Sequence, residues 1–421
     1  MTSTLIENAM IVTQNSLREI IRGNILIEND RISYIGNEKK EADTVLSGKN
    51  KIAMPGMINT HSHAAMGHFK GLLDDMSLEG FLEKTFKLDS ERSEEGIYNS
   101  SRLSMLEMVD SGITSFVDLY YSEDMVANAA REIGIRSFLS WVTLDEEFTT
   151  QKGSPIKNAE NFINSNKNDP LITPSIGVQG IYVSSDENYR KALDVSDRHG
   201  TILHTHLAET RKEVYDFVKK SGGKRPIEHL SEIGMLNERL LAAHCVWATL
   251  REVKLLAKGK AKVSWNAVSN SKLGVGGIAP VPEMLENGLT VTLGTDSNGS
   301  NNSLNPFESM KYAALSVKNE RWDASKITAQ TVLDMATING AMALGRGDLG
   351  SIETGKKADL ILLDSSRPNL VPTTEVNAVS NIVYSANTSN VDTVIINGRV
   401  LKHNGILSYE KMEEVRESRF N

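Results

Sequence analysis

Two histidines separated by one residue are the first sign of chemistry in this sequence. His61 and His63 end the segment PGMINTHSH (residues 55–63), in a chain that has only nine histidines. Residues i and i+2 of a β-strand point to the same face, so both imidazoles would project together from the end of a strand. Paired imidazoles suit a borderline-soft divalent metal, and a catalytic zinc needs about three protein ligands and an open position for water.

Further candidate ligands end other apolar segments. HTHLAET offers His204 and His206, AAHCV offers His244, and TLGTDSNGSNN offers Asp296. A lone histidine at such a position is more often a hydrogen-bonded core residue. Because all of these residues end predicted strands, the set as a whole favours a metal site.

The strands that would carry these residues alternate with amphipathic segments from residue 52 onward. This alternation is typical of βα units. We predict an α/β fold built on a (β/α)8 TIM barrel, whose active site lies at the C-terminal ends of its strands. The expected strands are residues 52–60, 113–120, 135–144, 172–178, 201–207, 239–245, 261–266 and 289–296.

Both ends of the chain have a different sequence pattern, in which short segments of alternating apolar and polar residues are separated by turn signals such as Asn397-Gly398. We expect one small composite β-sandwich built from both chain termini. The predicted division is residues 1–53 and 351–421 for the β-sandwich, and residues 54–350 for the metal-dependent barrel.

Composition excludes several classes of function. The formal charge is −8, from 46 basic and 54 acidic residues, and the absence of a long basic block does not favour nucleic acid. The single cysteine, Cys245, allows neither an intramolecular disulfide nor a thiolate metal site, and we expect it to be a buried core thiol. No signal-peptide pattern and no stretch of ~18 apolar residues is present, so we expect a cytoplasmic protein without a membrane partner.

Several segments together resemble the amidohydrolase superfamily: PGMINTHSHAAM, HLAET, AAHCV, SNSKLG and VTLGTDSNGSNNSLN. They are most similar to its branch of 5'-methylthioadenosine/S-adenosylhomocysteine deaminases and triazine hydrolases. The resemblance covers nearly the whole chain and implies one divalent metal ion, zinc, with iron as the alternative. The ligands that it implies are His61, His63, His206 and Asp296.

The resemblance also implies the catalytic residues. Glu209 resembles the proton shuttle, His244 the residue that holds the metal-bound water, and Asp296 can accept a proton from that water. His204 matches no family ligand, so we expect it to be packed behind the ligands. A solvated charge at the start of a helix is the alternative for Glu209.

Two other metal chemistries are set aside. Deaminases with an H-x-E and C-x-x-C zinc site need at least two cysteines. Binuclear members of the superfamily use a modified lysine at the fourth strand, and residues 171–185 contain no lysine. One metal ion is therefore expected.

The segments that normally contact substrate depart from the deaminase branch. Ser90 aligns with a glutamate that grips ribose hydroxyls, Trp141 with an arginine used for a substrate carboxylate, and Gln179 with a histidine. Trp265 replaces another histidine, and its alternative role is barrel packing. Without the arginine, a substrate carboxylate loses a charge-assisted contact, so S-adenosylhomocysteine is a weaker expectation than a smaller nucleoside. The two tryptophan rings could offer flat faces to a heteroaromatic ring.

The predicted function is a metal-dependent aminohydrolase that deaminates an adenine-nucleoside-like or other N-heteroaromatic ring. Its partner is a small heterocyclic substrate, and a homo-oligomer is expected by analogy. One alternative is a hydrolase of guanine, a pterin or a triazine, the last with chloride or an alkylamine as leaving group. A catalytically silent scaffold is the alternative of another class, against which stands the presence of all six polar site residues.

Overall fold

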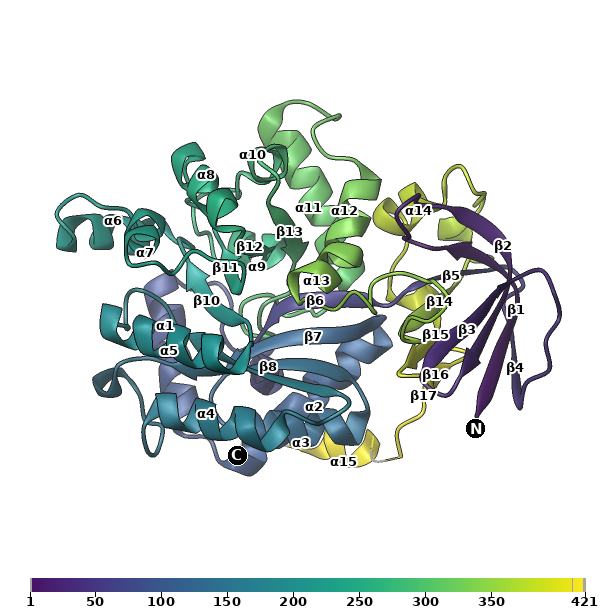
Figure 1. Ribbon diagram of the computed structural model, residues 1–421, viewed down its shortest axis with the longest axis horizontal. Helices are drawn as coiled ribbons and strands as arrows, with labels where there is room; N and C mark the ends of the chain where they lie inside the picture. Colours follow the sequence, from purple (N-terminus) through teal and green to yellow (C-terminus); the bar gives the residue numbers. More distant parts are fainter. Residues whose placement is uncertain (1, 411, 419–421) are drawn as a thin grey trace.

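Eight parallel strands, paired in chain order, form the centre of the molecule (Figure 1). Beyond the last strand the ring is closed by a bridge between Ser62 and Asp296, where the Asp296 N–H donates to the His61 carbonyl at 3.0 Å. The prediction of a (β/α)8 barrel is therefore confirmed. In the computed structural model, which describes residues 2–410 and 412–418, the barrel strands are β6 (Met57–Ser62), β7 (Ile113–Tyr120), β8 (Arg136–Thr143), β9 (Ile172–Val178), β10 (Leu203–Leu207), β11 (Leu240–His244), β12 (Lys262–Trp265) and β13 (Thr290–Leu293).

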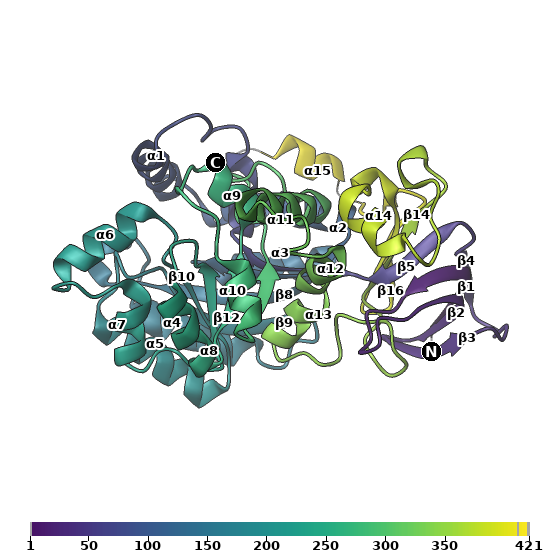
Figure 2. The same cartoon turned by 90° about the horizontal axis from the view of Figure 1, so that it is seen from above.

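Helices cover the outside of the barrel (Figures 1 and 2). Several begin where a serine or threonine side chain accepts a hydrogen bond from the first turn, as Ser93, Ser185 and Thr249 do. The helices around the barrel are η1 (Ala64–Phe69), α1 (Leu78–Ser90), α2 (Glu94–Asp110), α3 (Glu123–Ile133), η2 (Glu146–Phe148), α4 (Pro155–Asn166), α5 (Asp186–His199), α6 (Arg211–Lys220), α7 (Pro226–Glu232), α8 (Leu250–Gly259), α9 (Ala267–Lys272), α10 (Val281–Glu286), α11 (Pro306–Arg321), α12 (Ala329–Ala336) and α13 (Ile338–Ala343).

None of the helices within the described ranges has both the length and the apolar character that a bilayer crossing requires.

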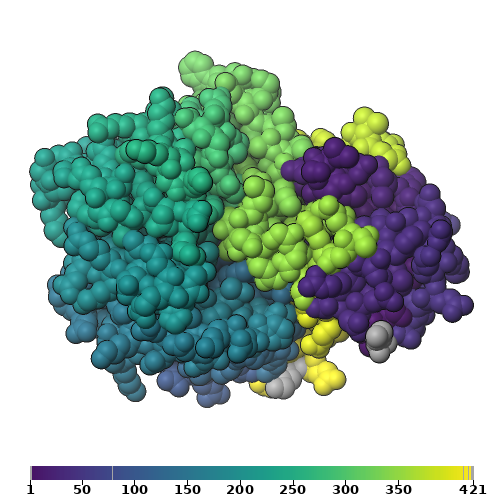
Figure 3. All heavy atoms as spheres, viewed as in Figure 1, coloured from purple at the N-terminus to yellow at the C-terminus, as the bar shows by residue number. Residues whose placement is uncertain are grey.

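The two ends of the chain build a second sheet, whose atoms gather at one end of the molecule (Figure 3). Its order is β17-β16-β15-β14-β5-β1-β2-β3, with β4 also paired to β1, and its strands enclose an apolar cluster of their own. The prediction of a β-domain composed of both termini is confirmed. Its strands are β1 (Ser3–Val12), β2 (Ile20–Glu28), β3 (Arg31–Gly36), β4 (Thr44–Ser47), β5 (Lys51–Pro55), β14 (Leu360–Asp364), β15 (Val391–Ile396), β16 (Arg399–His403) and β17 (Ile406–Leu407).

Two helices between residues 368 and 417 pack on the barrel side of the molecule. The C-terminal elements are η3 (Pro368–Leu370), α14 (Ala378–Tyr384), η4 (Thr388–Asn390) and α15 (Met412–Glu417). The helix α14 packs against α11 and α12, and α15 packs against α2. The segment 351–421 therefore contributes to both halves of the molecule.

The strand predicted over residues 52–60 is wrong, because this segment forms two strands in two sheets. β5 pairs with β1 and β14 of the terminal sheet, whereas β6 pairs with β7 of the barrel. Gly56 lies between them, and a Cβ there would fall 2.1 Å from side-chain atoms of Thr114. Both strands are buried on both faces, so the apolar run continues through the change of sheet. The predicted division at residue 53 lies inside β5.

Candidate metal centre

The four predicted ligands meet at the C-terminal ends of the barrel strands. His61 lies on β6 and His63 directly follows that strand, His206 lies on β10, and Asp296 follows β13. The Nε2 atom of His63 lies 3.3 Å from Nε2 of His206 and 3.5 Å from Oδ1 of Asp296. Nε2 of His61 lies 3.9 Å from the same Asp296 oxygen. These atoms are thus close enough to share one ion.

Hydrogen bonds to the main chain orient two of the imidazoles. Nδ1 of His63 donates to the Leu119 carbonyl at 2.7 Å, and Nδ1 of His206 donates to the Gln179 carbonyl at 2.6 Å. A carbonyl oxygen only accepts, so in each neutral ring Nδ1 carries the proton and Nε2 presents a lone pair. Two lone pairs therefore face each other at 3.3 Å, an unfavourable contact unless a cation lies between them.

The donor set fits a divalent metal. Two imidazole nitrogens bound tetrahedrally to one zinc at 2.0–2.1 Å are about 3.3 Å apart, which matches the observed separation. Nε2 of His61 is buried and has no hydrogen-bond partner among the described residues, as expected of a nitrogen whose lone pair would bind a metal. Burial, and then the neighbouring imidazoles, lower the pKa of His61 and His206 well below the ordinary value, which keeps them in the neutral, ligating form.

The carboxylate of Asp296 is fixed on both oxygens. Oδ2 accepts a hydrogen bond from the Ser269 hydroxyl at 2.6 Å, and Oδ1 accepts one from the Ser297 N–H at 2.8 Å. The residue has a φ of 64°, in the left-handed region that non-glycine residues seldom adopt. This conformation turns the side chain at the strand end toward the imidazoles.

Glu209 and His244 lie on one side of this cluster. Oε1 of Glu209 is 3.7 Å from Nδ1 of His244, and a set of ligand atoms from these two residues and Asp296 lies within 4.8 Å of one another. Burial raises the pKa of Glu209 to about 8, and the negative charge of Asp296 adds to the effect. A carboxyl group that holds its proton near neutral pH is suited to general acid catalysis.

Two asparagine side chains hold the His244 ring. The amide groups of Asn270 and Asn266 lie 2.8 and 3.2 Å from His244 Nδ1. The same nitrogen lies 3.7 Å from the Glu209 carboxylate. Side-chain amides therefore orient His244, whereas main-chain carbonyls orient His63 and His206.

The turn that carries Glu209 is held by a second glutamate. Glu213, in the first turn of α6, accepts hydrogen bonds from the N–H groups of Ala208 at 2.9 Å and Glu209 at 2.8 Å. The Thr210 hydroxyl accepts from the Glu213 N–H at 3.0 Å, which completes a capping box. The alternative role of Glu209, a solvated charge at the start of this helix, does not explain why its carboxylate lies beside His244.

Of the predicted substrate-contacting residues, Gln179 contacts a predicted ligand and Ser90 does not. Gln179 follows β9, where its main-chain oxygen holds His206 and its side chain donates to the Tyr182 hydroxyl at 3.1 Å. Ser90 ends α1, and its hydroxyl donates to the Lys87 carbonyl within that helix.

The neighbour of Ser90 is better placed than Ser90 itself. The carboxylate of Asp89 accepts hydrogen bonds from the Tyr120 hydroxyl and from Arg92. The Tyr120 ring centroid is 6.2 Å from that of His63. Asp89 therefore belongs to a network that reaches the ligand cluster, whereas the hydrogen bond of Ser90 stays within α1.

The two tryptophans do not join the cluster. The Trp141 ring lies 5.7 Å from that of Phe162 on α4, and its Nε1 donates to Gln151 at 2.8 Å. Trp265 is 1% exposed and stands between two residues that face the barrel interior, Ser264 and Asn266, so its ring points to the opposite face of β12. Its position matches the packing alternative.

Sequence reasoning missed the residues that hold the predicted catalytic side chains, which are Asn266, Asn270, Ser269 and Glu213. A signal was present for Asn266, because it follows Ser264 by two residues and so shares its face of the strand. Cys245 is fully buried in the core, as predicted.

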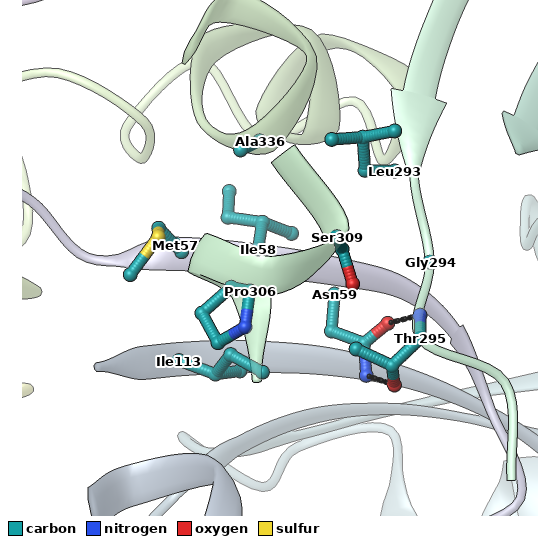
Figure 4. A pocket seen from close by; sticks show the side chains of 10 residues that line it. All are labelled: Met57, Ile58, Asn59, Ile113, Leu293, Gly294, Thr295, Pro306, Ser309 and Ala336. Carbon is teal, nitrogen blue, oxygen red and sulfur yellow. Dashed lines mark hydrogen bonds between the residues drawn. The ribbon is translucent and has the colours of Figure 1, made fainter. Parts of the chain in front are cut away.

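A small cavity lies beside the barrel wall, between β6, the end of β13 and the helices α11 and α12 (Figure 4). Its volume is about 10 Å³, and at its edge Asn59 donates to the Thr295 hydroxyl at 2.7 Å. A cavity of this size holds about one water molecule. It is therefore too small for a heterocyclic substrate.

Comparison with known proteins agrees with this geometry. The amidohydrolase family profile matches residues 52–401. The chain is 37% identical over 418 residues to a 5-methylthioadenosine/S-adenosylhomocysteine deaminase of Thermoanaerobacter pseudethanolicus, covering 98% of this chain and 96% of the relative. It is 38% identical over 417 residues to a 5'-deoxyadenosine deaminase of Methanothermobacter thermautotrophicus, covering 98% and 95%.

Solved structures give the same result for the fold. A zinc-bound adenosine deaminase from Xanthomonas campestris superposes with a TM-score of 0.94 at 28% identity, covering 99% of this chain and 96% of that one. A triazine hydrolase from Arthobacter aurescens superposes with a TM-score of 0.91 at 22% identity, covering 99% and 98%. The chain belongs to the amidohydrolase family.

Proposed function

We propose that this protein is a metal-dependent aminohydrolase that deaminates an adenine-type nucleoside and releases ammonia. The observation that carries the proposal is the convergence of four metal-ligating side chains with Glu209 and His244 at one end of the barrel. Full-length relatives at 37 and 38% identity are named as deaminases of adenine nucleosides. Family membership and these relatives make the chain a hydrolase that acts on C–N bonds.

The metal would be held by His61, His63, His206 and Asp296, with zinc favoured and iron as the alternative. Three imidazoles and one carboxylate form a donor set that zinc accepts, and a structural neighbour is described with bound zinc. When bound, such a cation supplies Lewis-acid activation of a water molecule at neutral pH.

The side chains around the ligands would move the protons of the reaction. In deamination, a water oxygen bonds to the ring carbon that carries the amino group. The bond from this carbon to the amine nitrogen breaks, and ammonia leaves as the carbon becomes a carbonyl. Glu209 would donate a proton to the adjacent ring nitrogen. Asp296 would accept one proton from the water and pass it to the departing amine, and the second proton of the water would return to Glu209 as the carbonyl forms. His244 would orient the water.

Among adenine nucleosides we favour adenosine or 5'-methylthioadenosine over S-adenosylhomocysteine. Position 141, where the deaminase branch tends to carry an arginine, holds a tryptophan whose ring faces Phe162. This position therefore supplies no cation for a substrate carboxylate. We also predict that the protein is cytoplasmic and that it forms a homo-oligomer.

Guanine, pterin and triazine substrates are the competing assignments within the same site. The triazine hydrolases that superpose on the chain are 22% identical, a level at which the likeness concerns the fold alone. The silent-scaffold alternative is disfavoured because every polar residue of the proposed site is present and converges.

A substrate panel tests the proposal directly. Zinc-loaded protein should release ammonia from adenosine, 5'-methylthioadenosine or 5'-deoxyadenosine faster than from guanine, a pterin or an aminotriazine. The decrease in absorbance that accompanies conversion of an adenine to a hypoxanthine ring gives a second readout. Ammonia release from none of the three nucleosides would contradict the proposal.

The role of Glu209 has its own test. Glu209→Gln should retain the metal and lower kcat by about 10²–10⁴-fold, because the amide cannot deliver a proton. Asp216→Asn is the matched control, since this carboxylate is half exposed on α6 and pairs only with Lys212 among the described residues. Full activity of Glu209→Gln would remove Glu209 from the mechanism.

A further inference from the structure

His204 is a buried histidine without a catalytic role in the proposed function. It lies on β10 two residues before His206, and it is completely buried inside the barrel. Its Nε2 atom is 3.0 Å from Nδ1 of His61, and the two ring centroids are 4.9 Å apart. A hydrogen bond therefore joins His204 directly to one of the proposed ligands.

This contact makes His61 different from the other two histidine ligands. His63 and His206 each donate from Nδ1 to a main-chain carbonyl, which can only accept. His61 meets instead another imidazole, whose nitrogen can either donate or accept. The tautomer of His61 therefore depends on the tautomer of His204.

Metal binding selects one of the two possible arrangements. In the first, His61 donates from Nδ1 to Nε2 of His204, and Nε2 of His61 presents a lone pair to the cluster. In the second, His204 donates to His61, and Nε2 of His61 carries a proton toward the cluster. Each arrangement leaves one buried ring N–H without a partner among the described residues, Nδ1–H of His204 in the first and Nε2–H of His61 in the second. Only the first arrangement can bind a metal.

The other nitrogen of His204, Nδ1, is buried and has no hydrogen-bond partner among the described residues. It does not select between the two arrangements. The selection comes from the lone pair that His61 must present to a metal.

We propose that His204 is a positioning residue that fixes the tautomer and the orientation of His61 for metal binding. The inference rests on the proposed metal site, but it does not depend on which substrate the enzyme turns over. His204 acts as a substitute for the main-chain carbonyls that hold His63 and His206. Partners of this kind typically change metal affinity by about 10–100-fold when they are removed.

The test compares two substitutions of similar size by their zinc affinity, measured by competition with a chromogenic chelator. His204→Leu removes the acceptor and should weaken zinc binding about 10–100-fold. His204→Gln can accept from His61 through its amide oxygen and should bind zinc more tightly than the leucine variant. Ser140→Ala is the control, because it removes a buried hydrogen bond to Ser175 in the barrel and touches no site residue.

Two results would overturn the inference. One is a folded His204→Leu variant with the zinc affinity of the unchanged protein, and the other is a glutamine variant that binds no better than the leucine variant. Should His204→Leu fail to fold, imidazole nitrogen NMR of the zinc-loaded protein decides the matter. Nε2 of His204 must then appear unprotonated and Nδ1 of His61 protonated, and the reverse assignment refutes the proposal.

The experiment also separates this inference from the proposed function. Zinc affinity is measured without substrate. If no adenine nucleoside is deaminated, the proposed function fails while the ranking of the His204 variants still stands. If adenosine is deaminated but His204→Leu keeps full zinc affinity, the proposed function stands and this inference fails.

Discussion

The ion pair between Arg136 and Asp359 joins the barrel to the terminal sheet, and its loss should destabilise the whole protein. Their side chains are 1 and 4% exposed, and the guanidinium donates to both carboxylate oxygens, at 2.6 and 3.1 Å. Arg136 also donates to the Pro170 carbonyl at 3.1 Å and to the Asn397 amide oxygen at 3.0 Å. The Asn397 N–H donates to Asp359 at 2.7 Å.

The size of the effect follows from what remains after each substitution. The donors to the Asp359 carboxylate named above are the Arg136 guanidinium and the Asn397 N–H. After Arg136→Met, only the Asn397 N–H of these two still donates to the buried carboxylate. Breaking a buried pair in this way typically costs about 3–5 kcal/mol, because one charge stays buried without compensation. Arg136→Met combined with Asp359→Leu removes both charges and should be more stable than Arg136→Met alone. Arg190→Met is the control, because Arg190 and Asp186 form an exposed pair worth about 1 kcal/mol or less.

Thermal unfolding followed by circular dichroism measures these differences. With an unfolding entropy of about 2.1 cal/mol/K per residue, 1 kcal/mol shifts the Tm of a 421-residue chain by about 1 °C, so Arg136→Met should lower the Tm by about 3–6 °C. The control should stay within about 1 °C of the unchanged protein on the same scale. The reasoning is refuted if Arg136→Met falls no further than the control, or if the double variant is the least stable of the three.

Two further predictions concern the site. Glu213→Gln leaves one acceptor oxygen for the N–H groups of Ala208 and Glu209, so kcat should fall about tenfold or more at unchanged metal content, since an unsatisfied buried N–H costs about 1–3 kcal/mol. Unchanged kcat in steady-state assays would show that the turn needs no such support. Removing the metal with a chelator should lower the Tm, and zinc at about 1,000 times its Kd should restore about 4 kcal/mol of stability. Asp296→Asn should lose most of this zinc-dependent shift, and a full shift in that variant would remove Asp296 from the ligand set.

The barrel could be predicted because each of its units is local in the sequence. A strand, a helix and the turns between them leave period-2 and 3.6-residue signals within about 30 residues. The strand ends also mark the rim of a barrel's active site, so residue type and position together indicate His61, His206 and Asp296. What failed was the segment at residues 52–60, where one apolar run passes from one sheet to another.

The direction of the tryptophan side chains could not be read from hydrophobicity. Strands of a parallel barrel are buried on both faces, so an apolar residue does not tell the interior from the helix-covered side. Small polar residues mark the interior better, because Ser140 and Ser264 make hydrogen bonds there. Trp141 and Trp265 each follow such a serine directly, and strand alternation places both on the outer face.

The backbone at the site could not be predicted from local sequence at all. Ala208, His244 and Asp296 have φ values of 49, 74 and 64°, in a region where glycine or asparagine would be expected. Such conformations cost about 1–3 kcal/mol each and persist only where other contacts impose them. Here those contacts are long-range, since the Trp247 N–H donates to the Ala208 carbonyl at 2.9 Å and the Asp296 N–H to the His61 carbonyl at 3.0 Å. The sequence therefore indicates which residues meet, while closure of the barrel decides how their side chains face one another.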